Sequence, residues 1–117
     1  MLARLDVDPE ALVRFLADGD GPVVLVNLVR LREGGRDAYR RYGEAVGPLL
    51  ARHGAEVLYA GEPVARLTGD EEWDVAVVAR YPSRAALAAL VRDPDFEATA
   101  PLRHEALEAG LLYGFDA

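Results

Sequence analysis

The chain of 117 residues contains no cysteine and no lysine, and these two absences remove several kinds of chemistry. Without cysteine there is no disulfide, no thiol nucleophile and no thiolate metal site. Without lysine there is no Schiff-base mechanism, and all 13 basic residues are arginines. We attribute this one-sided use of arginine to the base composition of the genome.

Long apolar runs and positive charge are also scarce. No run approaches the ~20 apolar residues that span a membrane. The first residues include Arg4, Asp6, Asp8 and Glu10, where a signal peptide would be apolar without interruption. A formal net charge of −7 provides no basic stripe for phosphates and disfavours anionic membranes. We therefore expect a soluble cytoplasmic protein that binds neither nucleic acid nor a membrane.

About half of the residues, 51%, are hydrophobic, which is typical of a globular protein. At this length we expect a single domain over residues 1–117, which buries roughly two thirds of its unfolded surface.

The segment from Val23 to Val29 is apolar on both sides of the pleat, apart from one amide at Asn27. Side chains alternate across a strand, so the strands of a sheet with one solvent-exposed face would alternate apolar and polar residues. Both faces of this strand must therefore be covered. Helices can cover one face, and we expect a second copy of the protein to cover the other, which predicts a face-to-face homodimer.

The other elements follow from caps and periodicity. Asp8-Pro9-Glu10 is typical of a helix start, and Ser83 is suited to cap another helix. Pro48 predicts a kink near Gly47 in the long helix, and Gly43 and Gly47 predict that this helix lies close to the sheet. The predicted elements are a short helix from residue 8, strand 23–31, helix 36–53, strand 56–67 interrupted at 61–63, strand 73–81, helix 84–91, a helix from 93 to 109 broken near residue 101 and closed by residue 110, and strand 111–115.

Without the first short helix, this order is strand, helix, strand, strand, helix, strand. It predicts the α+β class and a ferredoxin-like βαββαβ fold, with a four-stranded antiparallel sheet and helices on one face. The first and third strands are expected in the centre. Pro63 indicates that the second strand lies at an edge.

A series of short motifs resembles the family known as domain of unknown function 1330. The motifs are Gly21-Pro22-Val23-Val24-Leu25-Val26-Asn27-Leu28, Tyr39 to Gly43, Leu58-Tyr59-Ala60-Gly61, Glu72-Trp73-Asp74, Arg80-Tyr81-Pro82-Ser83-Arg84 and Asp93-Pro94. The resemblance covers nearly the whole chain and implies the dimeric α+β-barrel superfamily, in which two ferredoxin-like protomers pack sheet against sheet. Relatives in that superfamily include cofactor-free oxygenases, isomerases, haem-degrading enzymes and peroxidases, but a shared fold assigns none of these activities here.

Asn27, Tyr39, Tyr42 and Arg80 are the candidate catalytic residues. Asn27 either hydrogen-bonds the backbone, which we slightly favour, or orients a substrate carbonyl or an oxygen species. Tyr39 and Tyr42 lie on the sheet-facing side of the long helix, where they pack in the core or line a pocket. Arg80 shares a strand face with Asp74, and we expect ion pairs within the chain or across the dimer rather than a carboxylate ligand.

Other residues have simpler expected roles. Tyr59 and Tyr113 on the edge strands either pack, which we favour, or line a pocket. We expect Trp73 to anchor a strand entrance rather than to stack on a substrate. His53 and His104 are expected mainly at the surface, and neither has metal-ligand spacing. We therefore predict no metal site and no bound cofactor.

Two functions from different classes remain open. The first is a small-molecule enzyme without a cofactor, oxygenase- or isomerase-like, with a pocket in each protomer. The second is a non-catalytic ligand-binding or structural dimer. Haem degradation is a third, weaker possibility.

Overall fold

The computed structural model describes residues 7–117, so Arg4 and Asp6, which bear on the signal-peptide prediction, lie outside the described residues. Five helices and four strands are found in this part of the chain. They are α1 (Pro9–Ala17), β1 (Val23–Leu31), α2 (Arg36–Arg52), β2 (Glu56–Gly61), β3 (Val75–Tyr81), α3 (Arg84–Arg92), α4 (Pro94–Glu97), α5 (Ala100–Ala106) and β4 (Leu107–Asp116).

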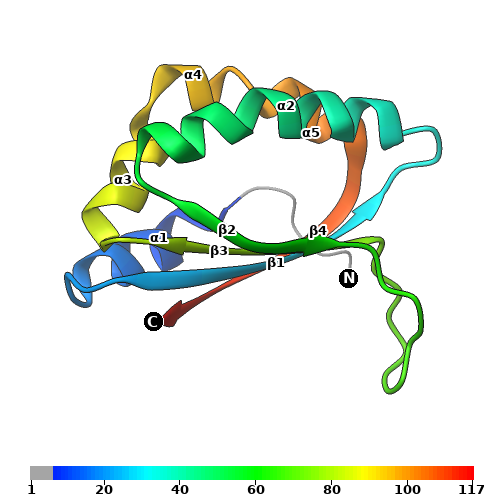
Figure 1. Ribbon diagram of the computed structural model, residues 1–117, viewed down its shortest axis with the longest axis horizontal. Coiled ribbons are helices and arrows are strands. Elements are labelled where there is room, and N and C mark those ends of the chain that lie inside the picture. The colour runs from blue at the N-terminus through cyan, green and yellow to red at the C-terminus, as the bar shows by residue number, and fades with distance from the viewer. Residues whose placement is uncertain (1–6) are drawn as a thin grey trace.

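The strands form one antiparallel sheet in the order β2-β3-β1-β4. Figure 1 shows α2, α3, α4 and α5 on one side of this sheet, while no helix lies across the other side. The ferredoxin-like fold with a short N-terminal helix is therefore confirmed, as are the central positions of β1 and β3. We call the uncovered side of the sheet the open face.

The local helix signals act as the sequence predicts. The carboxylate of Asp8 accepts a hydrogen bond from the backbone N–H of Glu10 at 3.0 Å, and Pro9 follows as the first helical residue. The hydroxyl of Ser83 accepts one from the N–H of Ala86 at 3.0 Å. Gly54, just past α2, has a φ of +77°, which glycine adopts without steric penalty.

Two strands are shorter than predicted. β2 ends at Gly61 and β3 begins at Val75, so Pro63 lies beyond the strand rather than within it. β2 is nevertheless at the edge of the sheet, as expected. Residues 62–74 form a long excursion between the two strands, which we call the arm.

The prediction for the last helix is correct in its break near Pro101 but wrong about its end. Instead of one broken helix to residue 109, two short helices are followed by β4, which already begins at Leu107. Gly110 does not close a helix; it pairs with Val29 inside the sheet. Pro101 lies in the first turn of α5, where a missing N–H leaves no helical bond unmade.

The two glycines of α2 do not bring it close to the sheet. A Cβ built at Gly43 or Gly47 would have no heavy atom within 4 Å outside its own helix backbone and chain neighbours, so that prediction is wrong. α2 continues through Pro48 as a single helix, and the predicted kink stays a prediction.

The core between helices and sheet is divided into two clusters. One surrounds Val23 and Tyr81, and the other surrounds Val29 and Val75. Each cluster lies toward one end of the central strands. Side chains that belong to neither cluster therefore occupy the middle of the core between helices and sheet.

Candidate functional site

The register of the strands determines which side chains face the helices. Val23 and Val29 of β1 belong to the two core clusters, so the odd-numbered residues between them, including Asn27, lie on the helix-covered face. The partners of Asn27 are Val77 on β3 and Leu112 on β4. Asn27 is therefore a polar residue with apolar partners on both sides, in the middle of the sheet.

The amide of Asn27 makes no side-chain hydrogen bond to any residue that the structure describes. In this part of the chain, every fully enclosed polar side-chain atom of a residue that is not exposed has a partner. The Asn27 amide must therefore be accessible to solvent, and its backbone-bonding interpretation is wrong. Leu112 beside it is 45% exposed.

Tyr39 and Tyr42 of α2 lie above this face of the sheet. Their rings are stacked, with centroids 6.2 Å apart and planes at 26°. Tyr39 packs against the cluster around Val29, and Tyr42 lies near enough to the Tyr81 phenol to affect its ionisation. The structure therefore brings Tyr39, Tyr42 and Tyr81 together between α2 and the sheet.

These three phenols are kept protonated. Burial raises the pKa of Tyr39 and of Tyr42 above the usual value. Burial, reinforced by the neighbouring Tyr42, raises the pKa of Tyr81 to about 12. At neutral pH each hydroxyl can therefore donate a hydrogen bond, and none of them donates to another residue in the described part of the chain.

Arg103 of α5 adds a positive charge to this region. Its guanidinium opposes the effect of burial and lowers the pKa of both Tyr39 and Tyr42. Sequence reasoning missed Arg103 and Tyr81 as site residues. For Tyr81 a signal was available, because it shares a strand face with Val75 and Val77, whereas nothing in the pattern around Arg103 pointed to the sheet.

Arg80 does not lie near Tyr39, Tyr42 and Tyr81, because it is on the other face of the sheet. Its β1 partner is Val24, so its side chain lies on the open face. It makes no ion pair with any described residue, and the Asp74 carboxylate accepts from the Leu31 N–H at 2.7 Å instead. The predicted ion pairs of Arg80 and Asp74 within the chain are therefore wrong, while a pair across a dimer stays a prediction.

The remaining aromatic residues differ in their surroundings. Tyr59 and Tyr113, paired with Val78 and Val26, lie on the open face at 57% and 60% exposure. The ring of Tyr59 lies over Gly61 of its own strand, so Tyr59 packs on the edge strand as expected. Trp73 anchors the base of the arm, because the Arg30 guanidinium lies over its ring at 4.8 Å.

The two histidines also differ. His104 is exposed, as expected. His53 is largely buried, and its Nε2 lies 2.8 Å from Asp93 Oδ2, so its predicted surface position is wrong. That pair joins the end of α2 to the turn between α3 and α4.

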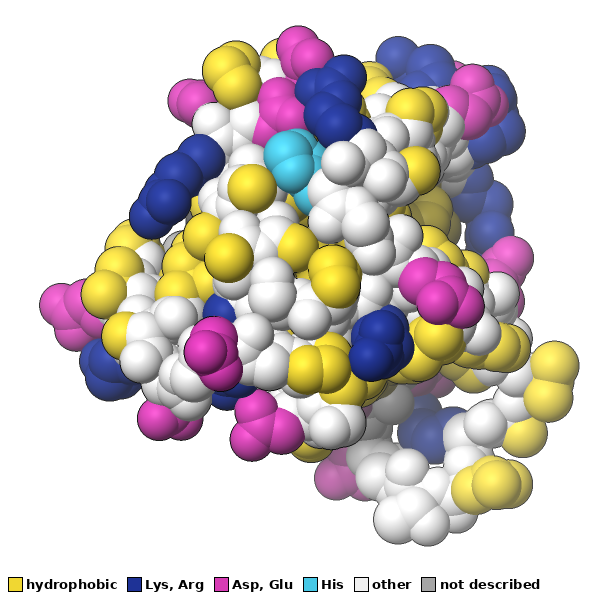
Figure 2. Space-filling view, turned by 60° about the vertical axis from the view of Figure 1, so that its left-hand side comes forward, with side chains coloured by type: hydrophobic (Ala, Val, Ile, Leu, Met, Phe, Trp, Pro, Cys, Tyr) yellow, Lys and Arg dark blue, Asp and Glu magenta, His cyan; other side chains and the backbone are white. Residues whose placement is uncertain are grey.

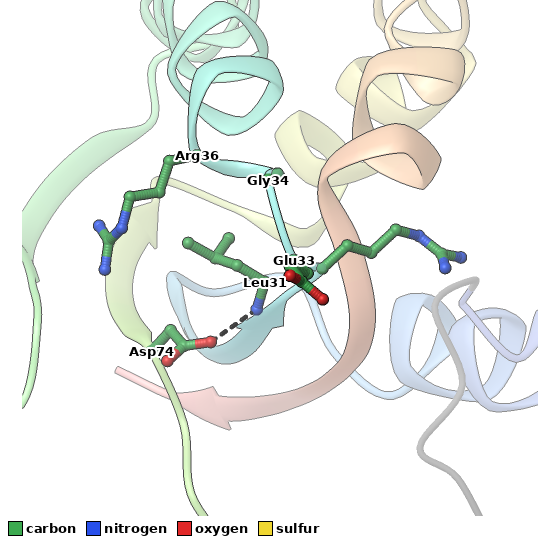
Figure 3. A pocket seen from close by; sticks show the side chains of 7 residues that line it. Leu31, Glu33, Gly34, Arg36 and Asp74 are labelled. Carbon is green, nitrogen blue, oxygen red and sulfur yellow. Dashed lines mark hydrogen bonds between the residues drawn. The ribbon is translucent and has the colours of Figure 1, made fainter.

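A surface hollow of about 330 Å³ lies where β1 turns into α2 (Figure 3). Its polar groups are mostly engaged with the fold. Asp74 accepts the Leu31 N–H, Arg36 donates to Glu62 at 2.7 Å, and Arg32 donates to the backbone oxygen of His104 at 3.0 Å. We therefore assign it a structural role in holding this turn.

Within residues 7–117, no three histidine or acidic side chains gather as a metal site would require. No helix in the same range combines the length and apolar character needed to cross a membrane.

Comparison with known proteins identifies the family to which this chain belongs. Residues 28–113 match the family described as Domain of unknown function (DUF1330). A crystal structure of methylated RPA0582 is 32% identical, covers 100% of this chain and 96% of its own, and superposes with a TM-score of 0.89. A second structure of RPA0582, a protein of unknown function from Rhodopseudomonas palustris, is 31% identical, with coverages of 98% and 97% and a TM-score of 0.87.

More distant structures share the fold. A dimeric ferredoxin-like protein of unknown function from Bacteroides fragilis is 17% identical, covers 83% of this chain and 97% of its own, and has a TM-score of 0.60. No sequence among the curated proteins matches. The family match and the identity to RPA0582 show that this chain belongs to the DUF1330 family.

Proposed function

We propose that the protein is a homodimer in which each protomer binds a small molecule between its helices and its sheet. The site is formed by the amide of Asn27 and the phenols of Tyr39 and Tyr42, with Tyr81 beside them. The observation that carries this proposal is that the three phenols lie together between α2 and the sheet, on the same face of the sheet as Asn27. None of these polar groups has a hydrogen-bond partner in the described chain. A bound molecule would supply those partners.

The chemistry of these groups suits an oxygen atom on the ligand. Protonated phenols and an amide NH₂ are neutral donors, which hold a carbonyl oxygen and stabilise negative charge that develops on it. We propose a cofactor-independent enzyme, oxygenase- or isomerase-like, in which these donors stabilise an enolate or phenolate form of the substrate. Arg103 would increase this stabilisation through its charge.

One observation favours a non-catalytic ligand-binding dimer as the second candidate. Proton abstraction needs a base within hydrogen-bond reach, and phenols with a raised pKa are poor bases. No carboxylate or imidazole in the described chain influences the ionisation of Tyr39, Tyr42 or Tyr81. Catalysis would therefore require a substrate that loses its proton easily, whereas binding alone has no such requirement.

The dimer is proposed from the open face of the sheet. Its central residues are apolar, and three aromatic residues on its edge strands, Tyr59, Tyr113 and Phe115, are half exposed or more although they belong to a regular sheet. The side chains on this face are Val24, Val26, Leu28, Tyr59, Ala76, Val78, Arg80, Leu111, Tyr113 and Phe115. A contiguous apolar surface of this kind marks an interaction site, and in the dimer Arg80 would find its acidic partner on the second copy.

Native mass spectrometry of gently purified protein tests both parts. We expect the mass of two chains plus a small molecule, which can then be identified. A dimer without added mass, even after incubation with a panel of phenols and enolisable ketones, would contradict the ligand site. A monomer at micromolar concentration would contradict the dimer. Haem degradation stays a prediction, and the absence of a Soret band after haemin is added would exclude it. The cytoplasmic location also stays a prediction.

A further inference from the structure

The arm extends from the sheet toward the side that carries no helix. In Figure 1 it leaves the ends of β2 and β3 and descends past the open face, away from α2 and α5. Figure 2 shows the same segment standing apart from the body of the molecule, with hydrophobic side chains on its surface. The arm therefore lies where a molecule covering the open face would be found.

Two apolar side chains of the arm are almost fully exposed to solvent. Val64 is 103% exposed and Leu67 is 92% exposed, more than any other large apolar side chain in the described chain. The base of the arm is nevertheless fixed, because Arg30 donates to the backbone oxygen of Glu72 at 2.9 Å and stacks on Trp73. A fixed base that presents unburied apolar side chains is suited to binding another surface.

We propose that the arm clasps a second copy of this chain, so that Val64 and Leu67 become buried against the partner. This inference rests on the dimer proposed above. The size of the open face supports it. Four strands of six to ten residues, about 4.8 Å apart and rising about 3.3 Å per residue, give a flat footprint of roughly 500 Å². A standard interface buries about 800 Å² per partner, so the arms would supply contact area that the sheet lacks.

The charges on the two surfaces are also complementary. Asp70 and Glu71 near the turn of the arm form no ion pair with described residues, whereas Glu72 pairs with Arg66 at 3.3 Å. Arg80 on the open face likewise has no ion-pair partner in the described chain. A second copy brings an acidic arm toward a face that carries this arginine, and by symmetry it does so twice.

The first test replaces Val64 and Leu67 together by serine. Because both side chains are fully exposed in the protomer, the variant should keep the circular dichroism spectrum of the wild type. Four apolar side chains, two on each arm, would lose their burial, so we expect the dimer dissociation constant from sedimentation equilibrium to rise at least about 100-fold. Val13→Ser on α1, also exposed at 65%, is the matched control and should leave the constant unchanged.

An unchanged dissociation constant in the serine variant would overturn the clasp while leaving the dimer intact. A monomeric wild type would instead overturn the dimer, and the clasp with it. These two failures are therefore distinguishable.

The second test uses the absence of cysteine in the chain. A single Leu67→Cys variant is treated with a polymer-linked maleimide. We expect slow reaction above the dimer dissociation constant and fast reaction below it, with Val13→Cys reacting fast at both concentrations. Equal reactivity of Leu67→Cys at both concentrations would overturn the proposal, as would protection that arises only when other cellular proteins are added.

Discussion

Replacing Asn27 by leucine separates a structural amide from one that serves a ligand. Asn27 lies between Val77 and Leu112 on the helix-covered face and makes no side-chain hydrogen bond to the described chain. The substitution therefore removes no internal hydrogen bond and adds apolar surface among apolar neighbours. We expect the folded protein to tolerate it and the ligand site to lose a donor and an acceptor.

The expected magnitude follows from these surroundings. Burying a leucine side chain fully is worth about 1.5–3 kcal/mol. Asn27 is only partly buried, so we expect a gain in unfolding free energy on the order of 1 kcal/mol. If the amide instead held the fold through a hydrogen bond, its removal would cost about 1 kcal/mol or more. The two interpretations differ in sign.

Urea unfolding at fixed protein concentration measures this difference, and native mass spectrometry measures the retained small molecule. We expect Asn27→Leu to unfold at a higher urea concentration and to lose the bound molecule. Tyr42→Phe is the companion variant, because it removes only a hydroxyl that has no partner in the described chain. A clear loss of stability in Asn27→Leu, with ligand retention unchanged, would refute our reasoning about this amide.

Three further predictions concern stability. Gly47→Ala should stabilise α2 by about 0.5–1 kcal/mol, because nothing lies near the added methyl group; a loss measured by thermal unfolding would contradict this. Gly35→Ala should destabilise by about 1–3 kcal/mol, since its Cβ would meet the backbone oxygen of Ala106, and an unchanged melting temperature would show that this turn can shift. Hydrogen bonds from His53, an N–H and an arginine lower the pKa of Asp93 from 3.8 to about 2, so its stabilising effect is complete above pH 4 and is lost as the pH falls toward 2. Acid titration of the unfolding free energy should show this dependence, and Asp93→Asn should remove it.

The parts of the fold that the sequence predicts correctly depend on local chemistry. The cap at Asp8, the cap at Ser83 and the apolar strand from Val23 each carry their signal within a few residues. The long-range order of the strands followed from these elements and the rule for right-handed crossovers. The recognised motifs agreed with that order.

The errors arise where tertiary pairing decides. Residues 107–110 have no helix-breaking residue before Gly110, yet Leu107 and its neighbours become part of β4 because they pair with β1. The segment that includes Val64 and Leu67 has the composition of a strand but finds no partner strand within the chain.

The candidate site was only partly predictable for the same reason. Alternation correctly separated Arg80 from Tyr81, but it could not determine which face the helices cover. That information came only from the packing of α2, which puts Tyr39 and Tyr42 on the same side of the sheet as Asn27. Arg103 was unpredictable because α5 is short and its orientation depends on the packing of the whole layer.

The open face of the sheet is the proposed dimer interface, and sedimentation velocity can show whether two copies meet there. The wild type should sediment as a dimer at micromolar concentration. Replacing both Val26 and Leu28 by glutamate places four carboxylates in the proposed interface but touches neither core cluster, so this variant should sediment as a folded monomer. A wild type that is monomeric, or a double variant that remains a stable dimer, would contradict the account.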